Sequence, residues 1–119
     1  LNLSFLHEKL DGIAFCPGAI QLKPFARIQP ADFIVDYNLQ VVGAIKVIQG
    51  ALPALKNAEQ ASIVLFSTVA VQLGLNFHSL VASSTGAIEG LGARMLIGSQ
   101  FGSPITGNCS TAACASLTR

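Results

Sequence analysis

Charge is the scarcest property of this 119-residue chain. Only 11% of its residues are Asp, Glu, Lys or Arg, whereas ordinary soluble domains carry about 25%. So little charge cannot coat a compact globule of this size, and part of the surface is expected to face other protein. The net charge of +1 and the lack of a basic run argue against nucleic-acid binding, which needs clustered Lys and Arg.

Cysteine pairs and metal-ligand patterns are also missing. Cys16, Cys109 and Cys114 are odd in number and have no C-x-x-C spacing. His7 and His78 do not complete a zinc-ligand set with them. We therefore expect no metal site, and reduced thiols of a cytoplasmic protein rather than a disulfide framework.

No charged residue lies between Glu59 and Glu89, a run long enough to raise the question of a membrane span. Gln72, Asn76 and His78 interrupt the run, and polar side chains are costly in hydrocarbon. A buried strand followed by a buried helix explains the same residues. The sequence therefore predicts no membrane span and, from its first residues, no signal peptide.

Two short apolar runs are typical of buried strands. Residues 12–16 are stopped by Pro17 and Gly18, and residues 61–66 are too uniformly apolar for a half-exposed strand. Between them, Pro30 opens a helix. The apolar stripe of that helix recurs at steps of three or four and consists of Phe33, Tyr37, Val41, Ile45, Ile48 and Leu52. Two parallel strands joined by a helix form a β-α-β unit.

The first helix is expected to end or kink at Pro53, with Asp32, Asp36 and Lys46 on its solvent face. A second helix is expected from after Gly74 to about residue 100. Its glycines, Gly86 and Gly90 among them, lower helix propensity and therefore indicate close packing on a sheet or a partner. A third short strand is expected near residues 106–109. The whole chain, 1–119, is expected to be one partial α/β domain.

Four segments, in their order and spacing, resemble the later part of a short-chain dehydrogenase/reductase. They are Asp11–Gly18, Ala51–Pro53, Ile63–Thr68 and Gly86–Leu91, and the similarity runs from about Leu10 to Leu96. The resemblance implies a partial doubly wound parallel sheet, Rossmann-like, of three strands with two long helices. It also implies hydride transfer between NAD or NADP and a carbonyl or alcohol.

The glycine-rich turn that holds the dinucleotide pyrophosphate in this family is not found in the chain. No G-x-G-x-x-G element occurs in the sequence, and no acidic residue is identified for the adenosine ribose. The chain is expected to be either a fragment of a longer protein or one without its cofactor half. Whether it binds NAD or NADP alone, and whether it is an enzyme, are left open.

The resemblance assigns the family's catalytic positions residue by residue. The Tyr position falls on Val81 and the Lys position on Thr85, neither of which can do the family's proton chemistry. The Ser position falls on Thr68, which keeps a hydroxyl, and the Asn position on Gln40, which keeps an amide. At the cofactor-lining turn, the resemblance places Cys16, Pro17 and Gly18.

Three further residues are weighed as candidates. Tyr37 is expected to be a core or interface residue, because aromatic residues at helical spacing usually serve packing. His78, just before the second helix, could be an acid or base at the mouth of a cleft or simply a solvated or capping residue. Ser67 and Thr68 come at the end of a strand, where ligands of open α/β sheets bind. Their hydroxyls could therefore contact a ligand, or they could form hydrogen bonds with the loop backbone.

Three hypotheses follow. The first is an oxidoreductase of the short-chain type that is catalytically degenerate or a fragment. The second is a non-catalytic binding or assembly subunit with the same fold. The third is a small membrane-associated protein. Members of the family commonly form dimers through these two helices. The resemblance therefore implies that the partner is either another copy of the chain, bound through the two long helices, or the missing N-terminal half.

Overall fold

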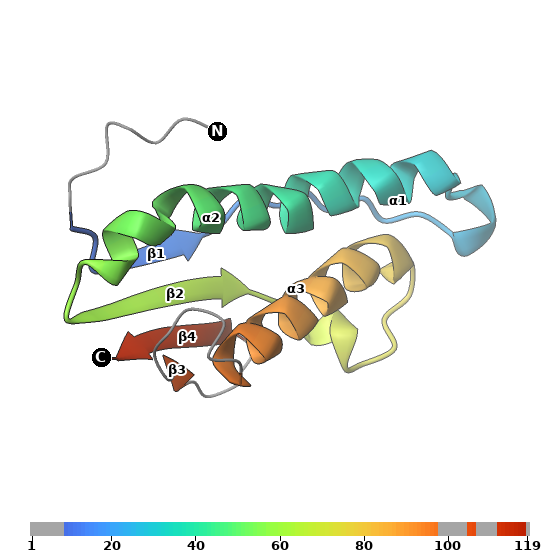
Figure 1. Cartoon of the computed structure of the whole chain (residues 1–119). Coiled ribbons are helices and arrows are strands. Elements are labelled where there is room, and N and C mark those ends of the chain that lie inside the picture. The colour runs from blue at the N-terminus through green and yellow to red at the C-terminus, as the bar shows by residue number, and fades with distance from the viewer. Residues whose placement is uncertain (1–8, 98–104, 107–111, 119) are drawn as a thin grey trace.

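The computed structural model describes residues 9–97, 105–106 and 112–118. One long helical rod lies over two strands, and a second helix lies beside it (Figure 1). The strands are β1 (Gly12–Phe15), β2 (Gln60–Phe66), β3 (Ile105–Thr106) and β4 (Ala112–Thr118). The helices are η1 (Phe25–Arg27), α1 (Pro30–Tyr37), η2 (Asn38–Val42), α2 (Gly43–Lys56), η3 (Val69–Val71) and α3 (Ser79–Ile97).

The predicted β-α-β unit is confirmed. Strands β1 and β2 are parallel, with Gly12 opposite Ser62 and Phe15 opposite Leu65. The rod α1–η2–α2 connects them, as a parallel pair requires, because such strands need a crossover of a dozen or more residues.

The prediction of three strands in a wholly parallel sheet is wrong for the described residues. The sheet has four strands in the order β1-β2-β4-β3, and β4 is antiparallel to both of its neighbours. Only five residues, 107–111, separate β3 from β4, too few for a parallel crossover. The third predicted strand overlaps β3 at Thr106, and residues 107–109 lie outside the described part of the chain.

The core lies between the parallel pair and the rod. Every second residue of β2 is buried, namely Ala61, Ile63 and Leu65, which is the period of a strand with one face against a helix layer. The other members of this core are Phe15, Val41, Ala44, Ile48, Ala51, Leu55, Ala58 and Ile88. Each fully buried Leu or Ile contributes about 1.5–3 kcal/mol relative to exposure.

Strand β1 is less buried than the sequence predicts. Phe15 is buried, but Gly12, Ala14 and Cys16 are exposed. The reason is its place in the sheet, because β1 is an edge strand with β2 as its one neighbour among the described strands.

The rod contains a π-helical turn, η2, between its two α-helical parts. A π turn holds one more residue than an α turn, so it shifts the phase of the buried stripe. At the π turn and downstream of it, Val41 and Ile48 are buried as the periodicity predicts, but upstream the buried position is Asp36 instead of Tyr37. The assignment of Asp36 to the solvent face is therefore wrong, and Tyr37 is 44% exposed.

Two predicted helix boundaries also differ. Pro53 does not end the rod, which continues to Lys56, because the missing N–H of an exposed proline leaves only one carbonyl without its helical donor. Helix α3 begins at Ser79, after a turn in which Phe77 has φ of 64°. The sequence pattern has no signal for that conformation, because bulky residues rarely adopt it.

The helix glycines pack less closely than predicted. A Cβ on Gly86 would stand an ordinary 3.7 Å from Val71 Cγ1, and one on Gly90 would meet nothing within 4 Å. The close contacts are instead at Gly12 and Gly43. A Cβ on Gly43 would stand 3.2 Å from the Phe15 ring, so this glycine lets the rod approach the end of β1.

Length and composition single out one helix of the described residues as able to cross a membrane. It is the rod Pro30–Lys56, and a third of its apolar window, 33%, is buried inside the protein.

Replacing Gly12 with Ala should destabilise the fold. The new Cβ would stand 3.0 Å from the backbone oxygen of Ser62, and a strand backbone cannot move without weakening the β1–β2 pairing. We expect a loss of about 1–3 kcal/mol in the free energy of unfolding, the usual range for overpacking, measured by urea denaturation. Gly18→Ala is the matched control, because a Cβ there meets nothing within 4 Å. Equal effects of the two changes would contradict the packing described here.

Candidate functional site

The candidate site lies where the two parallel strands end. Because Phe15 pairs with Leu65, the residues that follow β1 and β2 leave the sheet at the same edge. They are Cys16–Gly18 after β1 and Ser67–Thr68 after β2. The fold therefore brings together four of the predicted site residues, and this edge is where open α/β sheets bind ligands.

Thr68 begins the short helix η3. Its Oγ1 accepts a hydrogen bond from the backbone N–H of Ala70, at 3.3 Å, as a capping hydroxyl does. Accepting leaves the hydroxyl hydrogen available, so Thr68 can still donate to a ligand oxygen at the edge.

Helix α3 is tied to this edge by two contacts. The Ser67 hydroxyl donates a hydrogen bond to Glu89 Oε1, and Gly86 lies against Val71 of η3. A carboxylate is a strong acceptor, so Glu89 fixes the end of β2 relative to the helix. Ser67 is thereby partly explained as a structural hydroxyl.

Gln40 is buried on the π turn and bound to an acidic neighbour. Its Nε2 donates to both carboxylate oxygens of Asp36, each at 3.0 Å. Asp36 is 8% exposed and Gln40 is 5% exposed. The amide that the resemblance assigns to the family's Asn position is thus engaged within the helical rod. Sequence reasoning missed Asp36, because only the phase shift of the π turn buries it.

Val81 and Thr85, which the sequence resemblance assigns to the family's Tyr and Lys positions, are both buried on α3. The Thr85 hydroxyl donates to the backbone oxygen of Val81 at 2.6 Å. This bond back to the preceding turn satisfies the hydroxyl inside its own helix. Neither side chain therefore offers a proton or a positive charge to the edge.

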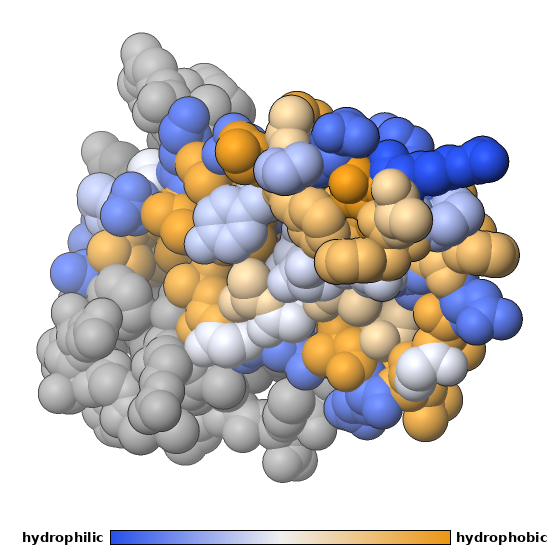
Figure 2. Space-filling view, turned by 90° about the vertical axis from the view of Figure 1, so that its right-hand side faces the viewer, coloured by the Kyte–Doolittle hydropathy of each residue, from blue (hydrophilic) through white to orange (hydrophobic). Residues whose placement is uncertain are grey.

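Two patches of apolar side chains remain on the surface. On α1 and η2, Ile34, Val35, Tyr37 and Leu39 are between 42% and 67% exposed. Between β2 and α3, the exposed apolar residues are Phe66, Val69, Leu73, Leu75 and Phe77. Apolar residues occupy much of the molecular face shown in Figure 2.

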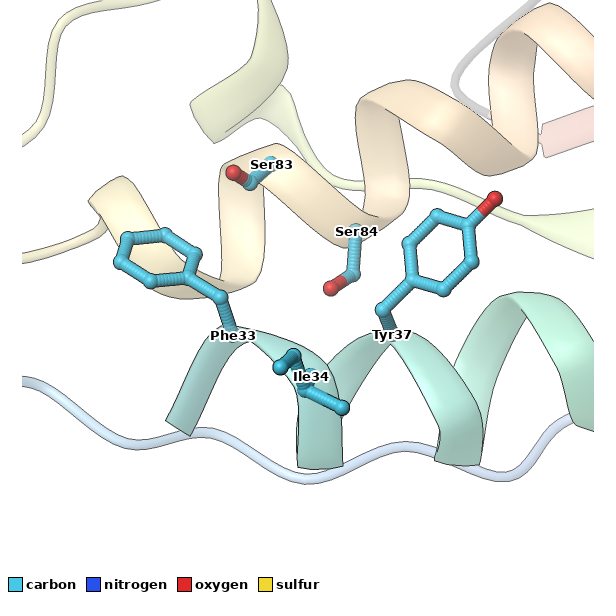
Figure 3. A pocket seen from close by; sticks show the side chains of 5 residues that line it. All are labelled: Phe33, Ile34, Tyr37, Ser83 and Ser84. Carbon is cyan, nitrogen blue, oxygen red and sulfur yellow. The ribbon is translucent and has the colours of Figure 1, made fainter. Parts of the chain in front are cut away.

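A shallow hollow of about 280 Å³ lies between α1 and α3. It is lined by Phe33, Ile34, Tyr37, Ser83 and Ser84. The rings of Phe33 and Tyr37 rise from α1 toward the two serines of α3 (Figure 3). None of these residues is a predicted catalytic position, so we separate this groove from the strand edge.

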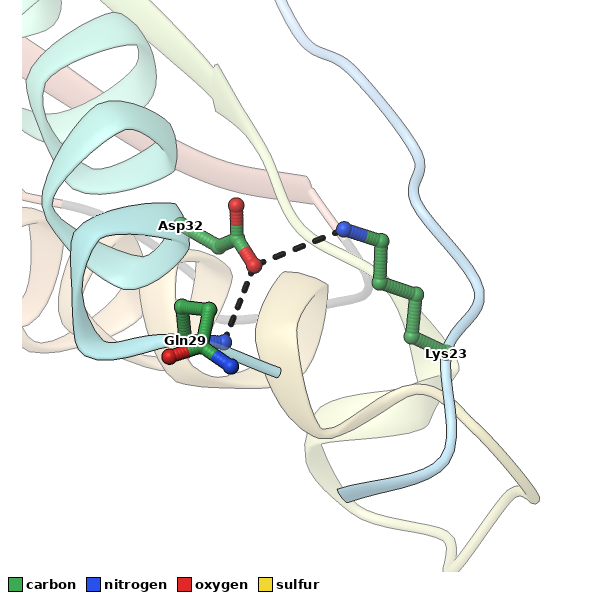
Figure 4. Close-up of polar contacts among 3 residues, drawn as sticks. All are labelled: Lys23, Gln29 and Asp32. Carbon is green, nitrogen blue, oxygen red and sulfur yellow. Dashed lines mark hydrogen bonds and ion pairs between the residues drawn. The ribbon is translucent and has the colours of Figure 1, made fainter. Parts of the chain in front are cut away.

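The start of α1 is held by a small polar cluster (Figure 4). Asp32 Oδ2 accepts from the backbone N–H of Gln29 at 3.0 Å and from Lys23 Nζ at 3.4 Å. The Gln29 bond, and to a lesser extent Lys23, hold the pKa of Asp32 below its ordinary value, against a smaller raising effect of burial. Asp32 therefore ties the segment after β1 to the first turn of the rod.

Within the described ranges, no group of three or more His, Cys, Asp or Glu side chains could hold a metal ion. Cys16 is exposed and free.

Replacing Asp32 with Asn should lower the melting temperature at pH 7. A carboxylate with a lowered pKa contributes stability above its unfolded value of about 3.9, and that contribution is lost as the pH falls through the folded pKa. We expect a decrease of roughly 1–3 °C at pH 7 that diminishes as the pH falls through the lowered pKa of Asp32. Glu59→Gln, at an exposed position outside any helix cap, is the control. A difference that does not diminish as the solution is acidified would contradict the assignment.

Comparison with known proteins gives matches in structure alone. No protein-family model and no curated protein matches the sequence. Solved structures of short-chain dehydrogenases/reductases match at probability 1.00. One from Escherichia coli CFT073, complexed with NADPH, has a TM-score of 0.74 and 21% identity, over 82% of this chain and 41% of its own.

Two more solved structures are similar to this chain. A short-chain dehydrogenase from Shigella flexneri has a TM-score of 0.71 and 21% identity, over 78% of this chain and 37% of its own. A 7α-hydroxysteroid dehydrogenase, complexed with NADH and 7-oxo glycochenodeoxycholic acid, has a TM-score of 0.69 and 24% identity, over 79% and 36%. This chain thus spans about two fifths of such proteins or less. Over about three quarters of its own length, it has the α/β fold of the short-chain dehydrogenases/reductases.

Proposed function

We propose that the chain is the later part of an NAD(P)-dependent oxidoreductase of the short-chain type, with an altered catalytic pair. One observation carries the proposal. The parallel strands β1 and β2 end together and present Cys16–Gly18 beside Ser67–Thr68, the arrangement that the sequence resemblance implies for a nicotinamide and a substrate oxygen.

The residues at this edge fit the nicotinamide end of a dinucleotide. Cys16–Gly18 are exposed, and the space around Gly18 is open to at least 4 Å from its Cβ position, so a flat ring has room to approach the backbone. Thr68 supplies a hydroxyl beside that space. The phosphate end has no counterpart in the chain, because no G-x-G-x-x-G turn occurs in its sequence.

When bound, NADH or NADPH would supply the hydride for a carbonyl carbon. The chain's own part is to orient the substrate and to deliver a proton to the oxygen. Thr68 donates a hydrogen bond to that oxygen and so holds the carbonyl at the edge. Val81 carries no proton to give, and the Thr85 hydroxyl is held by its own helix. The proton must therefore come from another group.

The missing phosphate-binding half would pair with the free edge of β1. This edge strand exposes Gly12 and Ala14, and an unpaired edge is a ready template for a further strand. Addition of that half would turn the present sheet into a doubly wound one, whose helices cover both faces. The odd number of cysteines and their lack of C-x-x-C spacing fit a reduced, cytoplasmic setting for the complete protein.

A second function is favoured by the surface of α1. The exposed apolar patch of Ile34, Val35, Tyr37 and Leu39 adjoins the groove beside α3 and is suited to another copy of the chain. If the protein is an assembly subunit, this patch is its working surface and the strand edge binds nothing. The two functions therefore differ in their need for a dinucleotide.

Dinucleotide binding by the complete natural protein tests the proposal. We expect the fluorescence of NADPH or NADH to change on binding, with a dissociation constant in the micromolar range, and a thermal shift to accompany it. Measurement of intact mass and oligomeric state on the same sample identifies what has been tested. A dimer that binds neither dinucleotide would instead establish the assembly function.

Restoring only the ammonium should not restore the family's usual chemistry. We expect Thr85→Lys alone to give no measurable increase in carbonyl reduction, because position 81 would still lack a phenol that the cation could activate. Turnover is measured by NADPH consumption with a ketone. A clear gain in that single variant would show that the assignment of Val81 and Thr85 to the catalytic positions is wrong.

A further inference from the structure

We propose that Glu89 is a positioning residue of the candidate site and that it acts through Ser67 to hold the Thr68 hydroxyl in place. The proposal rests on the proposed oxidoreductase function. It concerns a side chain of α3 to which the resemblance assigns no role.

Ser67 and Thr68 lie just beyond the end of the sheet. The parallel ladder with β1 ends at Leu65, and the antiparallel ladder with β4 ends at Phe66. Ser67 and Thr68 follow without a strand partner among the described residues. Because no ladder bond fixes their backbone, their position depends on side-chain contacts and on the turn that comes next.

Helix α3 contacts this segment on both sides of Thr68. Before it, the Ser67 hydroxyl donates to Glu89 Oε1 across 22 positions of the chain. After it, a Cβ on Gly86 would stand 3.7 Å from Val71 Cγ1, so the helix backbone lies against η3. Glu89 and Gly86 are three residues apart and therefore lie on the same side of α3. One side of the helix thus holds both ends of the segment that contains Thr68.

The Thr68 hydroxyl is oriented by the same segment. Its Oγ1 accepts from the N–H of Ala70 at 3.3 Å, and its backbone oxygen accepts from the N–H of Val71 at 3.1 Å. Both donors belong to η3, which has only three residues, and so short a helix has poor hydrogen-bond geometry of its own. By anchoring the chain just before this turn, Glu89 limits how far the Thr68 hydroxyl can move.

The bond to Glu89 also decides which hydroxyl can donate to a ligand. A hydroxyl has a single hydrogen. Ser67 gives its hydrogen to a carboxylate, which is a strong acceptor, whereas Thr68 accepts from Ala70 and keeps its own. At the end of β2, Thr68 is therefore the hydroxyl that remains available to a substrate oxygen.

Other ionisable side chains near α3 are engaged elsewhere in the described part of the chain. His78 Nδ1 lies 2.6 Å from the backbone oxygen of Asn76. Asp36, on the helix that packs against α3, is bound by Gln40. Glu89 is distinguished from these groups by its direct contact with a residue of the strand edge.

The position of the donor affects the rate more than the binding of the substrate. A hydrogen bond to the carbonyl oxygen is strongest when negative charge develops on that oxygen as the hydride arrives. A displacement of about 1 Å at such a group can cost about 10²-fold in rate. Loss of the Glu89 anchor should therefore lower kcat and leave KM little changed.

The first test measures ketone reduction by the complete natural protein, with NADPH and a panel of acetone, cyclohexanone and acetophenone. We expect Glu89→Ala to lower kcat roughly 10-fold with little change in KM. Ser67→Ala removes the other partner of the bond and should have a similar effect, and it provides the same comparison if Glu89→Ala does not fold. Glu89→Gln keeps an oxygen that accepts from Ser67, so it should retain more of the wild-type kcat.

Gly90→Ala is the matched control. It changes the neighbouring residue of α3, at a position where a Cβ meets nothing within 4 Å, and should retain the wild-type kcat.

Coupling to Thr68 separates positioning from a general loss of structure. Thr68→Ala removes the donor and should lower kcat roughly 10²-fold. In that background Glu89→Ala should have no further effect, because both changes remove the same hydrogen bond to the substrate. Additive losses in the double variant would overturn the positioning role, and so would a wild-type kcat in Glu89→Ala.

Amide hydrogen exchange, followed by NMR without dinucleotide, tests the anchor itself. We expect Glu89→Ala to speed exchange roughly 10-fold at Ala70 and Val71 and to leave Ile63, buried in β2, unchanged. Equal acceleration at all three amides would show that Glu89 serves only general stability, and would overturn its positioning role while the oxidoreductase function stands. A wild type that neither binds NADPH nor reduces the panel would overturn both.

Discussion

The packing of the helical rod on the parallel pair is the constraint on which the rest of the structure depends. Alanines at positions 44 and 51 are 0% and 1% exposed and belong to one buried cluster with Ile63 and Leu65 of β2. Gly43 lets the rod approach the end of β1, next to the Phe15 ring. Close packing at these points sets the strands parallel and in register. The two strand ends, and with them the candidate site, are aligned as a consequence.

The π turn in the rod also determines which of its side chains are buried. It allows one helix to place apolar residues on the sheet downstream and the polar pair of Asp36 and Gln40 under α3 upstream. A buried carboxylate is costly without a partner, and the Gln40 amide provides that partner at 3.0 Å. The same shift turns Tyr37 outward, so this residue, expected in the core or at an interface, lines a surface groove. One extra residue in one turn therefore leaves apolar side chains of the rod on the surface.

The fold was predictable where the sequence signal is local. Pro17 and Gly18 mark the end of β1, Pro30 marks the start of the rod, and the uniform run of β2 indicates a buried parallel strand. The phase shift was not predictable, because nothing in residues 38–42 favours a π turn over an α turn. The antiparallel pairing of β4 was not predictable either, since its alternation of small and polar residues sets no register.

At the site, the sequence resemblance named Thr68 and Cys16–Gly18 as candidates, and the parallel pairing of β1 and β2 brings them to one edge. The hydrogen bonds around these residues depend on tertiary contacts and could not be predicted from the sequence. Glu89 reaches Ser67 across 22 positions, and no local pattern links the two.

The proposed loss of both the phenol and the ammonium is easier for the fold to accommodate than the loss of one of them would be. A phenol without its ammonium would remain protonated and a poor donor near neutral pH, and an ammonium without a phenol would have no partner to activate. The two groups act as one unit, so replacement of either removes the reason to keep the other. Val81 and Thr85 then resemble residues of an ordinary buried helix face. Val81 is apolar, and the Thr85 hydroxyl donates a hydrogen bond to the backbone oxygen of Val81 at 2.6 Å. The helix is thereby relieved of a buried charge.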